Sequence, residues 1–89
     1  MAKAAHARSV RAALKAEVAS GQVDLAEVFR RADADEVVAN IRVLTLLEAM
    51  PNIGKVRSRR LLEELEISER RRLRGVGDRQ RERLLGRMS

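Results

Sequence analysis

The sequence predicts a small all-α protein, and three observations support that fold class. Apolar residues recur at intervals of three and four along most of the 89-residue chain, which is the spacing of one helix face. No stretch alternates apolar and polar residues over more than a few positions with β-branched enrichment, as strands do. The chain is also short enough for one domain only. We expect residues 1–89 to form it, with an N-terminal helix in 1–21, a helical scaffold in 22–50 and a basic half in 51–89.

The first predicted helix is long and covers residues 3–20. Three apolar residues, spaced four apart, form its inner face: Val10, Leu14 and Val18. Gly21 follows at the position where a helix C-cap favours a left-handed residue. Three basic residues share another side of this helix: Arg8, Arg11 and Lys15. That side is either a solvated face or a second, weaker contact for phosphate groups.

The scaffold over 22–50 is predicted to contain two helices. Asp24 is a suitable N-cap for the first of them, and Glu27 stands where a capping box places its acid. Three apolar residues of this helix face the core: Leu25, Val28 and Phe29. After a turn at 33–35, one continuous helix is predicted from Val37 to Met50, because its apolar residues keep helical spacing. Pro51 ends it, since proline disfavours a helical conformation in the residue before it.

The half over 51–89 contains one pattern twice. The first copy is Met50-Pro51-Asn52-Ile53-Gly54-Lys55 with Leu61-Leu62 behind it, and the second is Leu73-Arg74-Gly75-Val76-Gly77-Asp78 with Leu84-Leu85 behind it. Each copy predicts a tight turn that leads into a helix N-terminus, where unpaired N–H groups and the helix dipole favour a phosphate. Asn52 stands where the second copy has Gly75, and we expect Asn52 to tolerate a left-handed backbone. The alternative is that both turns are plain connections that bind nothing.

Two further helices are predicted in this half. The helix over 55–65 is expected to bury four apolar residues: Val56, Leu61, Leu62 and Leu65. Ser68 is expected to cap a single turn over 69–72. The last helix covers 79–87 with Asp78 as its cap, and it turns Leu84, Leu85 and Met88 toward the core.

The net positive charge of the chain lies entirely in the half that carries the two turns. Residues 1–50 hold seven basic and seven acidic residues, whereas residues 51–89 hold twelve basic and six acidic ones, which accounts for the net charge of +6. Eleven of those twelve are arginines, whose planar guanidinium suits phosphate oxygens. The segment from Arg70 to Arg74 places four of them directly before the second turn. The alternative for this cluster is pairing with Glu66 and Glu69, which would neutralise one arginine but not four.

The composition argues against several classes of function. The chain has no Cys, Tyr or Trp and a single histidine, His6, so we find no catalytic residues, no metal site and no need for a cofactor. No apolar run is long enough to cross a membrane, and the first 20 residues lack the apolar centre of a signal peptide. Phe29 is the only aromatic residue and is expected in the core, so none remains for stacking single-stranded bases.

The segment from Val43 to Leu85 closely resembles the actinobacterial integration host factor family. The likeness is strongest over Leu46 to Arg57 and over Ile67 to Gly77. It implies a small all-helical nucleoid-associated protein with a C-terminal helix-two-turns-helix motif, which also occurs in ribosomal protein S13. It further implies a monomer that binds duplex DNA with little sequence preference, bends or compacts it, and influences DNA topology, recombination and transcription.

The resemblance and the residue pattern together give one set of expected DNA contacts. The residues are Pro51, Asn52, Ile53, Gly54, Lys55, Val56, Arg57, Arg71, Arg72, Arg74, Gly75 and Gly77. The expected partner is double-stranded DNA, with no membrane and no small-molecule substrate, and the expected location is the nucleoid in the cytoplasm. A ribosomal type of RNA-binding module, a protein-interaction domain and a DNA repair enzyme were the alternatives, the last of which lacks any recognisable catalytic group.

Overall fold

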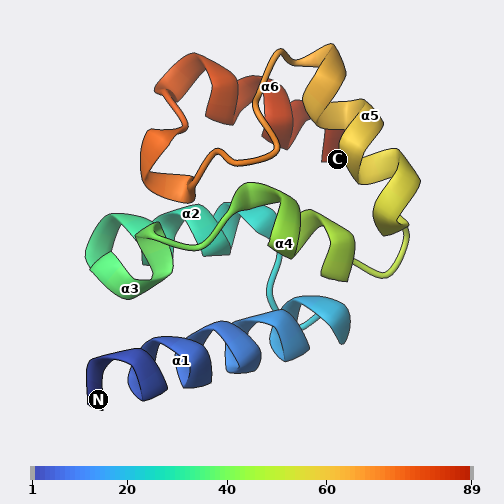
Figure 1. Cartoon of the computed structure of the whole chain (residues 1–89). Helices are drawn as coiled ribbons and strands as arrows, with labels where there is room; N and C mark the ends of the chain where they lie inside the picture. Colours follow the sequence, from blue (N-terminus) through green and yellow to red (C-terminus); the bar gives the residue numbers. More distant parts are fainter. Residues whose placement is uncertain (1, 89) are drawn as a thin grey trace.

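The computed structural model describes residues 2–88, which form six α-helices and one short 3-10 helix without any named strand (Figure 1). In chain order the elements are α1 (Ala2–Ala19), α2 (Leu25–Ala34), α3 (Glu36–Ala39), α4 (Val43–Ala49), α5 (Gly54–Glu64), η1 (Leu73–Gly75) and α6 (Asp78–Met88). The predicted all-α fold is therefore confirmed. Met1 and Ser89, which the single-domain prediction includes, lie outside the described residues.

The helices form three tiers around one core (Figure 1). The long helix α1 lies along one side and packs on α3 and α4, while α5, η1 and α6 lie on the other side of the α2–α4 layer. The largest fully buried apolar side chains come from all three tiers: Val18, Val28, Phe29, Val43, Leu46, Leu47, Leu62, Leu73 and Leu84. Within residues 2–88, no helix combines the length and apolar character that a membrane span needs.

The connection from α1 to α2 has the predicted glycine and the predicted Asp24 cap, but the capping box with Glu27 is wrong, because the Glu27 carboxylate binds arginines of α2 instead. Gly21 has a φ of +82°, so the left-handed residue after α1 is the glycine that was expected there. The Asp24 carboxylate accepts a hydrogen bond of 2.9 Å from the N–H of Glu27 and caps α2. The Glu27 carboxylate binds Arg30 and Arg31, and Arg31 also reaches Glu17 on α1 at 3.3 Å. Of these ion pairs, the one between Arg31 and Glu17 joins α2 to α1.

The continuous helix predicted from Val37 to Met50 is wrong, because the chain breaks between α3 and α4. The N–H of Val43 donates to the carbonyl of Arg71 at 3.0 Å, and the N–H of Leu73 donates to the carbonyl of Ile41 at 2.9 Å. These two bonds make an isolated antiparallel bridge between Arg42 and Arg72. A continuous helix would need the carbonyl of Ile41 and the N–H of Val43 for its own hydrogen bonds. The segment 71–73 binds both groups instead, so the helix is interrupted here.

The prediction that Val56 faces the core is also wrong, because its side chain is 75% exposed. The buried face of α5 consists of Ser58, Leu61 and Leu62, with Leu65 just beyond the helix. Val56 lies two residues before Ser58, about 200° away around the helix, so it points outward. Ser58 is tolerated in the core because its hydroxyl donates a hydrogen bond of 2.5 Å to the carbonyl of Gly54.

Helix α6 begins one residue earlier than predicted and has a different cap. Asp78 is its first residue, and the carbonyl of Gly77 accepts the first helical bond, from Arg81 at 2.8 Å. Gln80 bends back so that its amide oxygen accepts the N–H of Gly77 at 3.2 Å. Gly77 therefore takes the N-cap position and Gln80 the N3 position of a capping box, in place of the expected Asp78 cap.

Candidate functional site

The first predicted turn connects α4 to α5 and depends on a single left-handed residue. Met50 is extended (φ −69°, ψ 136°), as expected for a residue before proline. Gly54 has a φ of +73°, whereas Asn52 is not among the residues with positive φ. The expectation that Asn52 would supply the left-handed conformation is therefore wrong. The glycine shared by both copies of the pattern does so in this turn.

The N-terminus of α5 at this turn is open to an anion. The N-cap residue Ile53 makes no side-chain cap hydrogen bond, and the first helical turn contains no acidic residue. The first N–H groups of an α-helix have no acceptor inside it, and the positive end of the dipole lies there. Pro51, Asn52, Gly54 and Lys55 are exposed around these groups and Ile53 is half-buried.

The backbone of the second turn is already occupied. The N–H groups of Gly75 and Val76 donate to the carbonyls of Arg72 and Leu73 at 2.9 and 3.2 Å. The N–H of Gly77 donates to Gln80, as described above. Asp78 adds a carboxylate at the start of α6. The two copies of the sequence pattern therefore differ in structure. In the second copy the N–H groups of the turn already have acceptors and a carboxylate begins the helix, whereas the first copy has no acidic residue in the first turn of its helix.

Arginine side chains surround the second turn and bind backbone carbonyls. Arg71 donates from Nη1 to the carbonyl of Gly75 at 2.8 Å, and Arg72 donates from Nη1 to the carbonyl of Asn40 at 2.6 Å. Arg74 lies 3.6 Å from the Glu36 carboxylate on α3. Each guanidinium has five N–H groups, so these contacts hold the side chains in place and leave donors for another partner.

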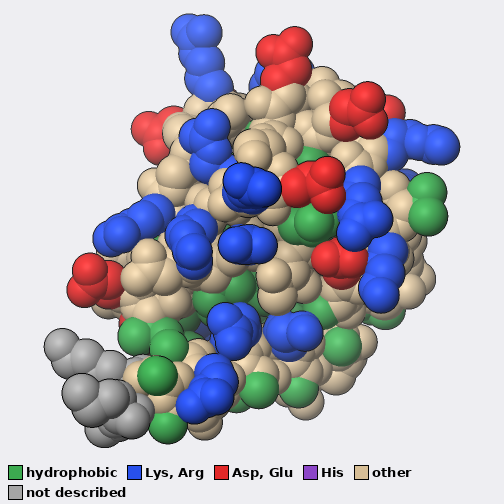
Figure 2. All heavy atoms as spheres, viewed as in Figure 1, with side chains coloured by type: hydrophobic (Ala, Val, Ile, Leu, Met, Phe, Trp, Pro, Cys, Tyr) green, Lys and Arg blue, Asp and Glu red, His purple; other side chains and the backbone are tan. Residues whose placement is uncertain are grey.

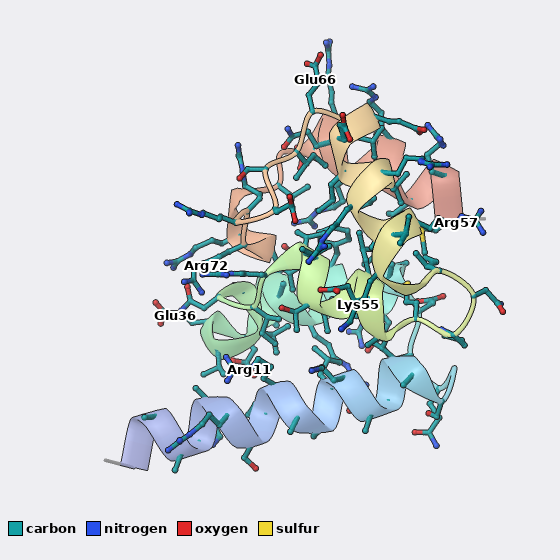
Figure 3. The ribbon with its side chains drawn as sticks, turned by 45° about the vertical axis from the view of Figure 1, so that its right-hand side comes forward. Arg11, Glu36, Lys55, Arg57, Glu66 and Arg72 are labelled. Atoms are coloured by element: carbon teal, nitrogen blue, oxygen red, sulfur yellow. The ribbon has the colours of Figure 1, made fainter. Side chains whose placement is uncertain are left out.

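The alternative that Glu66 and Glu69 neutralise this arginine cluster is wrong. Glu69 pairs instead with Arg59 of α5, at 3.2 Å. Glu66 points away from Arg72 at the top of the molecule, and it forms no ion pair within residues 2–88 (Figure 3). Among the described residues, the one carboxylate that pairs with the cluster is Glu36.

Arg42 is a basic residue of this surface that the sequence did not indicate. It pairs with Arg72 across the antiparallel bridge, and the hydrogen bonds flank this pair on both sides. In such a non-hydrogen-bonded pair the Cα atoms come about 4.5 Å apart and the side chains leave the same face. The structure gives neither guanidinium an acidic partner within residues 2–88. They stand 30 positions apart in the chain, and nothing in the sequence indicates that they pair.

Helix α4 separates the two turns. The bridge attaches the segment of Arg72 to Arg42, just before α4 begins. The turn that contains Gly54 comes after α4 ends at Ala49. The helix has seven residues. Its length is therefore about 10 Å at 1.5 Å per residue.

Lys55 and Arg57 do not act on the same side of α5. They stand two positions apart, about 200° around the helix, and Figure 3 shows their side chains on different flanks. Arg57 turns toward the first turn from the other side and donates to the carbonyl of Asn52 at 3.4 Å. The structure thus brings Lys55 to the open helix N-terminus and directs Arg57 into a cavity beside it.

The predicted second group of basic residues lies on α1. Arg8, Arg11 and Lys15 are all exposed. Figure 2 shows basic side chains over α1 on the same face of the molecule as those over the upper helices, with acidic side chains interspersed. Within the described residues, these three basic side chains form no ion pair.

Comparison with known proteins gives consistent matches. The family model for an S13-like H2TH domain matches residues 18–88. The integration host factor of Mycobacterium tuberculosis (strain ATCC 25618 / H37Rv) is 49% identical over 83 residues, which cover 93% of this chain and 79% of that protein. The integration host factor of Streptomyces coelicolor (strain ATCC BAA-471 / A3(2) / M145) is 41% identical over 78 residues, with 88% and 73% coverage.

A solved structure gives the same result at the level of the fold. The structure of sIHF bound to an 8-bp palindromic DNA matches with a TM-score of 0.95 and 37% identity, and the match covers 100% of both chains. The resemblance inferred from the two turns is therefore confirmed. This chain belongs to the actinobacterial integration host factor family and has its S13-like H2TH fold.

Proposed function

We propose that this chain is a DNA-binding, nucleoid-associated protein that holds duplex DNA by its phosphates and has little sequence preference. The observation that carries the proposal is the pair Arg42 and Arg72, which lie side by side and have no acidic partner among residues 2–88. Like charges at directly opposed positions destabilise a bridge unless an anion offsets them. A phosphate would do so, and the structure of sIHF with DNA shows a relative of this chain bound to such a polyanion.

Two anchors are proposed for two phosphates. One is the N-terminus of α5, where Lys55 and the open N–H groups after Gly54 would receive the first phosphate. The other is the bridge, where Arg42, Arg72 and Arg74 would receive the second. The α4 helix, about 10 Å long, lies between these anchors and holds them at a fixed separation.

The proposed role is architectural, without a chemical step. Contacts to phosphates give affinity but no sequence information. Anchors held at a fixed separation favour DNA whose groove matches that separation, so bending or compaction would follow from binding. We propose a monomer acting at the nucleoid, with Arg8, Arg11 and Lys15 on α1 as a second, weaker DNA contact.

The first test is the salt dependence of binding, by fluorescence anisotropy with one duplex DNA and one structured RNA of equal length. If the two anchors and the three basic residues of α1 together neutralise about five phosphates, log K against log salt should fall with a slope of about −4 to −5, at roughly 0.9 per phosphate. The slope should be the same for unrelated DNA sequences. Tighter binding to the RNA would support the ribosomal type of module instead, and a slope near zero would exclude the electrostatic mechanism.

The double variant Lys55→Ala and Arg72→Ala tests the two anchors. We expect weaker binding to every DNA sequence alike, with the salt slope reduced in magnitude by about 2, because each residue contacts one phosphate. The control is Arg30→Ala with Arg83→Ala, which removes the same charge from exposed positions elsewhere. Equal losses in both double variants would mean that diffuse charge, and not the anchors, binds DNA. A thermal melt must show that the Arg72 variant keeps its fold without the bond to Asn40.

A further inference from the structure

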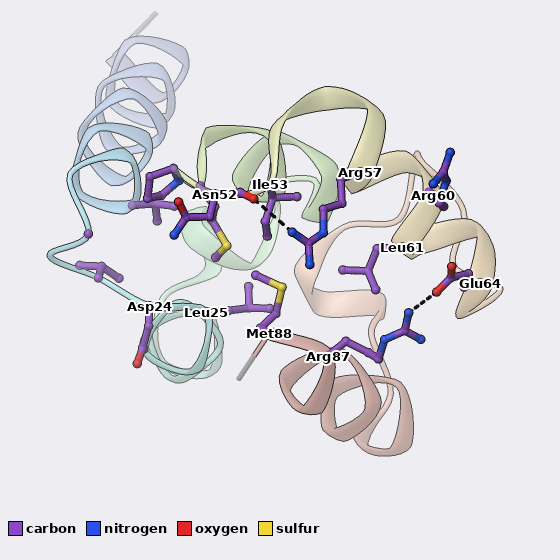
Figure 4. A pocket seen from close by; sticks show the side chains of 15 residues that line it. Asp24, Leu25, Asn52, Ile53, Arg57, Arg60, Leu61, Glu64, Arg87 and Met88 are labelled. Atoms are coloured by element: carbon purple, nitrogen blue, oxygen red, sulfur yellow. Dashed lines mark hydrogen bonds and ion pairs between the residues drawn. The ribbon is translucent and has the colours of Figure 1, made fainter.

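A cavity of about 520 Å³ opens beside the first turn (Figure 4). Residues from the α1–α2 connection, the first turn, α5 and the end of α6 line it. Its apolar surface includes Leu25, Met50, Ile53, Leu61 and Met88. The volume falls in the range of small-molecule sites, which are mostly apolar with a few polar groups that set orientation.

Two arginines supply the polar side of this cavity. Figure 4 shows Arg57 reaching from α5 into the cavity between Asn52 and Leu61, and Arg60 farther along α5 at the rim of the cavity. Arg57 makes one long hydrogen bond, of 3.4 Å, to the carbonyl of Asn52. Within residues 2–88, no side-chain hydrogen bond or ion pair engages the guanidinium of Arg60. Both arginines therefore have N–H groups left for a ligand.

The two acidic residues that line the cavity, Asp24 and Glu64, already have partners within the protein. The Glu64 carboxylate forms an ion pair with Arg87. The Asp24 carboxylate caps α2 by accepting the N–H of Glu27. Asp24 keeps its negative charge, so the two carboxylates and the three guanidinium groups of the lining (Arg57, Arg60 and Arg87) leave one net positive charge. Positive charge beside apolar surface is complementary to a molecule that carries an anionic group on an apolar body.

We propose that this cavity binds a small amphipathic anion, with its apolar part against Met50, Ile53 and Leu61 and its anionic group on Arg57 and Arg60. Charge-assisted hydrogen bonds from two guanidinium groups would fix the anionic end. The site lies on the flank of α5 opposite Lys55, and it borders the first anchor, because Pro51, Asn52 and Ile53 also line the cavity. It does not depend on DNA binding, and it is tested on the protein alone.

The probe is anilinonaphthalene sulfonate, whose fluorescence rises in an apolar site and which carries one anionic group. We expect saturable binding of one probe per chain, with shifts of the methyl NMR signals of Met50, Ile53 and Met88. The methyl groups of Val38, on α3 and outside this cavity, should not shift. The neutral phenylnaphthylamine has nearly the same apolar body and should bind about tenfold more weakly or worse, because it lacks the charged hydrogen bonds.

Matched variants separate the site from general surface charge. Arg57→Gln with Arg60→Gln should weaken binding of the sulfonate about tenfold or more, and should leave the neutral probe unchanged. Arg83→Gln removes an exposed arginine of α6 outside the cavity and should have no effect. Equal loss in the Arg83 variant, equal binding of the two probes, or NMR shifts away from the cavity would each overturn the proposal. The NMR mapping uses the unmodified protein, so a misfolded variant cannot produce a false result.

Discussion

Gly54 determines the shape of the first turn through its backbone conformation alone. Its φ of +73° lies in the left-handed region, where a side chain costs roughly 1–2 kcal/mol. An added Cβ would meet no atom within 4 Å, so crowding plays no part. Any replacement that keeps the fold must therefore tolerate this strain or move the N-terminus of α5.

Gly54→Ala should lower the free energy of unfolding by roughly 1–2 kcal/mol and should also weaken DNA binding. Gly21→Ala is the matched control, because Gly21 has a similar φ of +82° outside the two phosphate anchors. It should lose similar stability and keep its DNA affinity. Urea unfolding and anisotropy measure both quantities, and equal DNA affinity in the two variants would remove Gly54 from the proposed anchor.

Glu27 makes the stability of the protein sensitive to acid. Hydrogen bonds from Arg30 and then Arg31 lower the pKa of Glu27 from 4.5 to about 2. A carboxyl group with a depressed pKa in the folded state contributes stability above its unfolded pKa, and this contribution is lost as the pH falls toward the folded value. The relevant window is therefore from about pH 4.5 down to about pH 2.

Glu27→Gln should lower the melting temperature at pH 7 and flatten its dependence on pH across that window. Thermal melts followed by circular dichroism at several pH values measure both effects. Glu63→Gln replaces an exposed carboxylate of α5 and should keep the wild-type profile. If Glu27→Gln melts with an unchanged pH dependence, the ion pairs with Arg30 and Arg31 contribute nothing in solution.

Single residues show what the sequence can predict at this scale. The Asp24 cap and the left-handed Gly21 were predictable because their signals lie within a few residues of each other. Val56 was predicted wrongly because its apolar character was counted without its angle on the helix. The spacing of Ser58, Leu61, Leu62 and Leu65 holds the information that would have corrected it.

Among the elements, α3 and α4 depend on a segment far along the chain. The bridge takes the carbonyl of Ile41 and the N–H of Val43 out of helical bonding and pairs them with η1 and the residue before Arg72. The local sequence favours a helix here, so only the partner segment explains the break. Several β-branched residues around Asn40 weaken helix propensity, but that signal alone does not place a boundary.

Amide hydrogen exchange tests the bridge directly. The amides of Val43 and Leu73 should exchange slowly, because each donates to a carbonyl of the facing segment. The amides of Arg42 and Arg72 should exchange faster, since the structure gives them no backbone acceptor. These two amides are the internal control, being next in sequence to the protected ones. Fast exchange at Val43 and Leu73 would show that the bridge is not formed in solution.

The candidate site was predictable at the first turn and only partly at the second. The repeat in the sequence identifies both turns, but it cannot show that the N–H groups of Gly75, Val76 and Gly77 already have acceptors. Nor can it place Arg42 beside Arg72, since that neighbourhood exists only after folding. The separation of Lys55 from Arg57 was predictable in principle, from the helix period alone.

At the scale of the whole molecule, the basic half depends on the rest of the chain. Leu73 receives its backbone partner from Ile41, and Arg81 of α6 binds Asp33 of α2 at 2.9 Å and lies 4.6 Å from the centre of the Phe29 ring. The bonds from Arg81 also lower the pKa of Asp33. The 51–89 segment therefore shares its core and its turns with residues before Pro51.

A fragment of residues 51–89 should not fold on its own, because it lacks every one of these partners. Circular dichroism should show little helix and no cooperative melting transition. A fragment of residues 22–89 keeps the bridge and the Arg81 contacts, and it should melt cooperatively at a lower temperature than the full chain. A cooperative transition in the shorter fragment would show that its two turns form without the scaffold.

The shortness of α4 has a consequence for how this sequence can change over evolution. One residue inserted into or deleted from the seven residues of α4 would alter the spacing of the two turns by only about 1.5 Å, but it would rotate one against the other by about 100°. The two turns would then face different directions, although every residue of both was intact. The stretch from the bridge to Gly54 therefore accepts exchanges of one apolar residue for another more readily than any change of length.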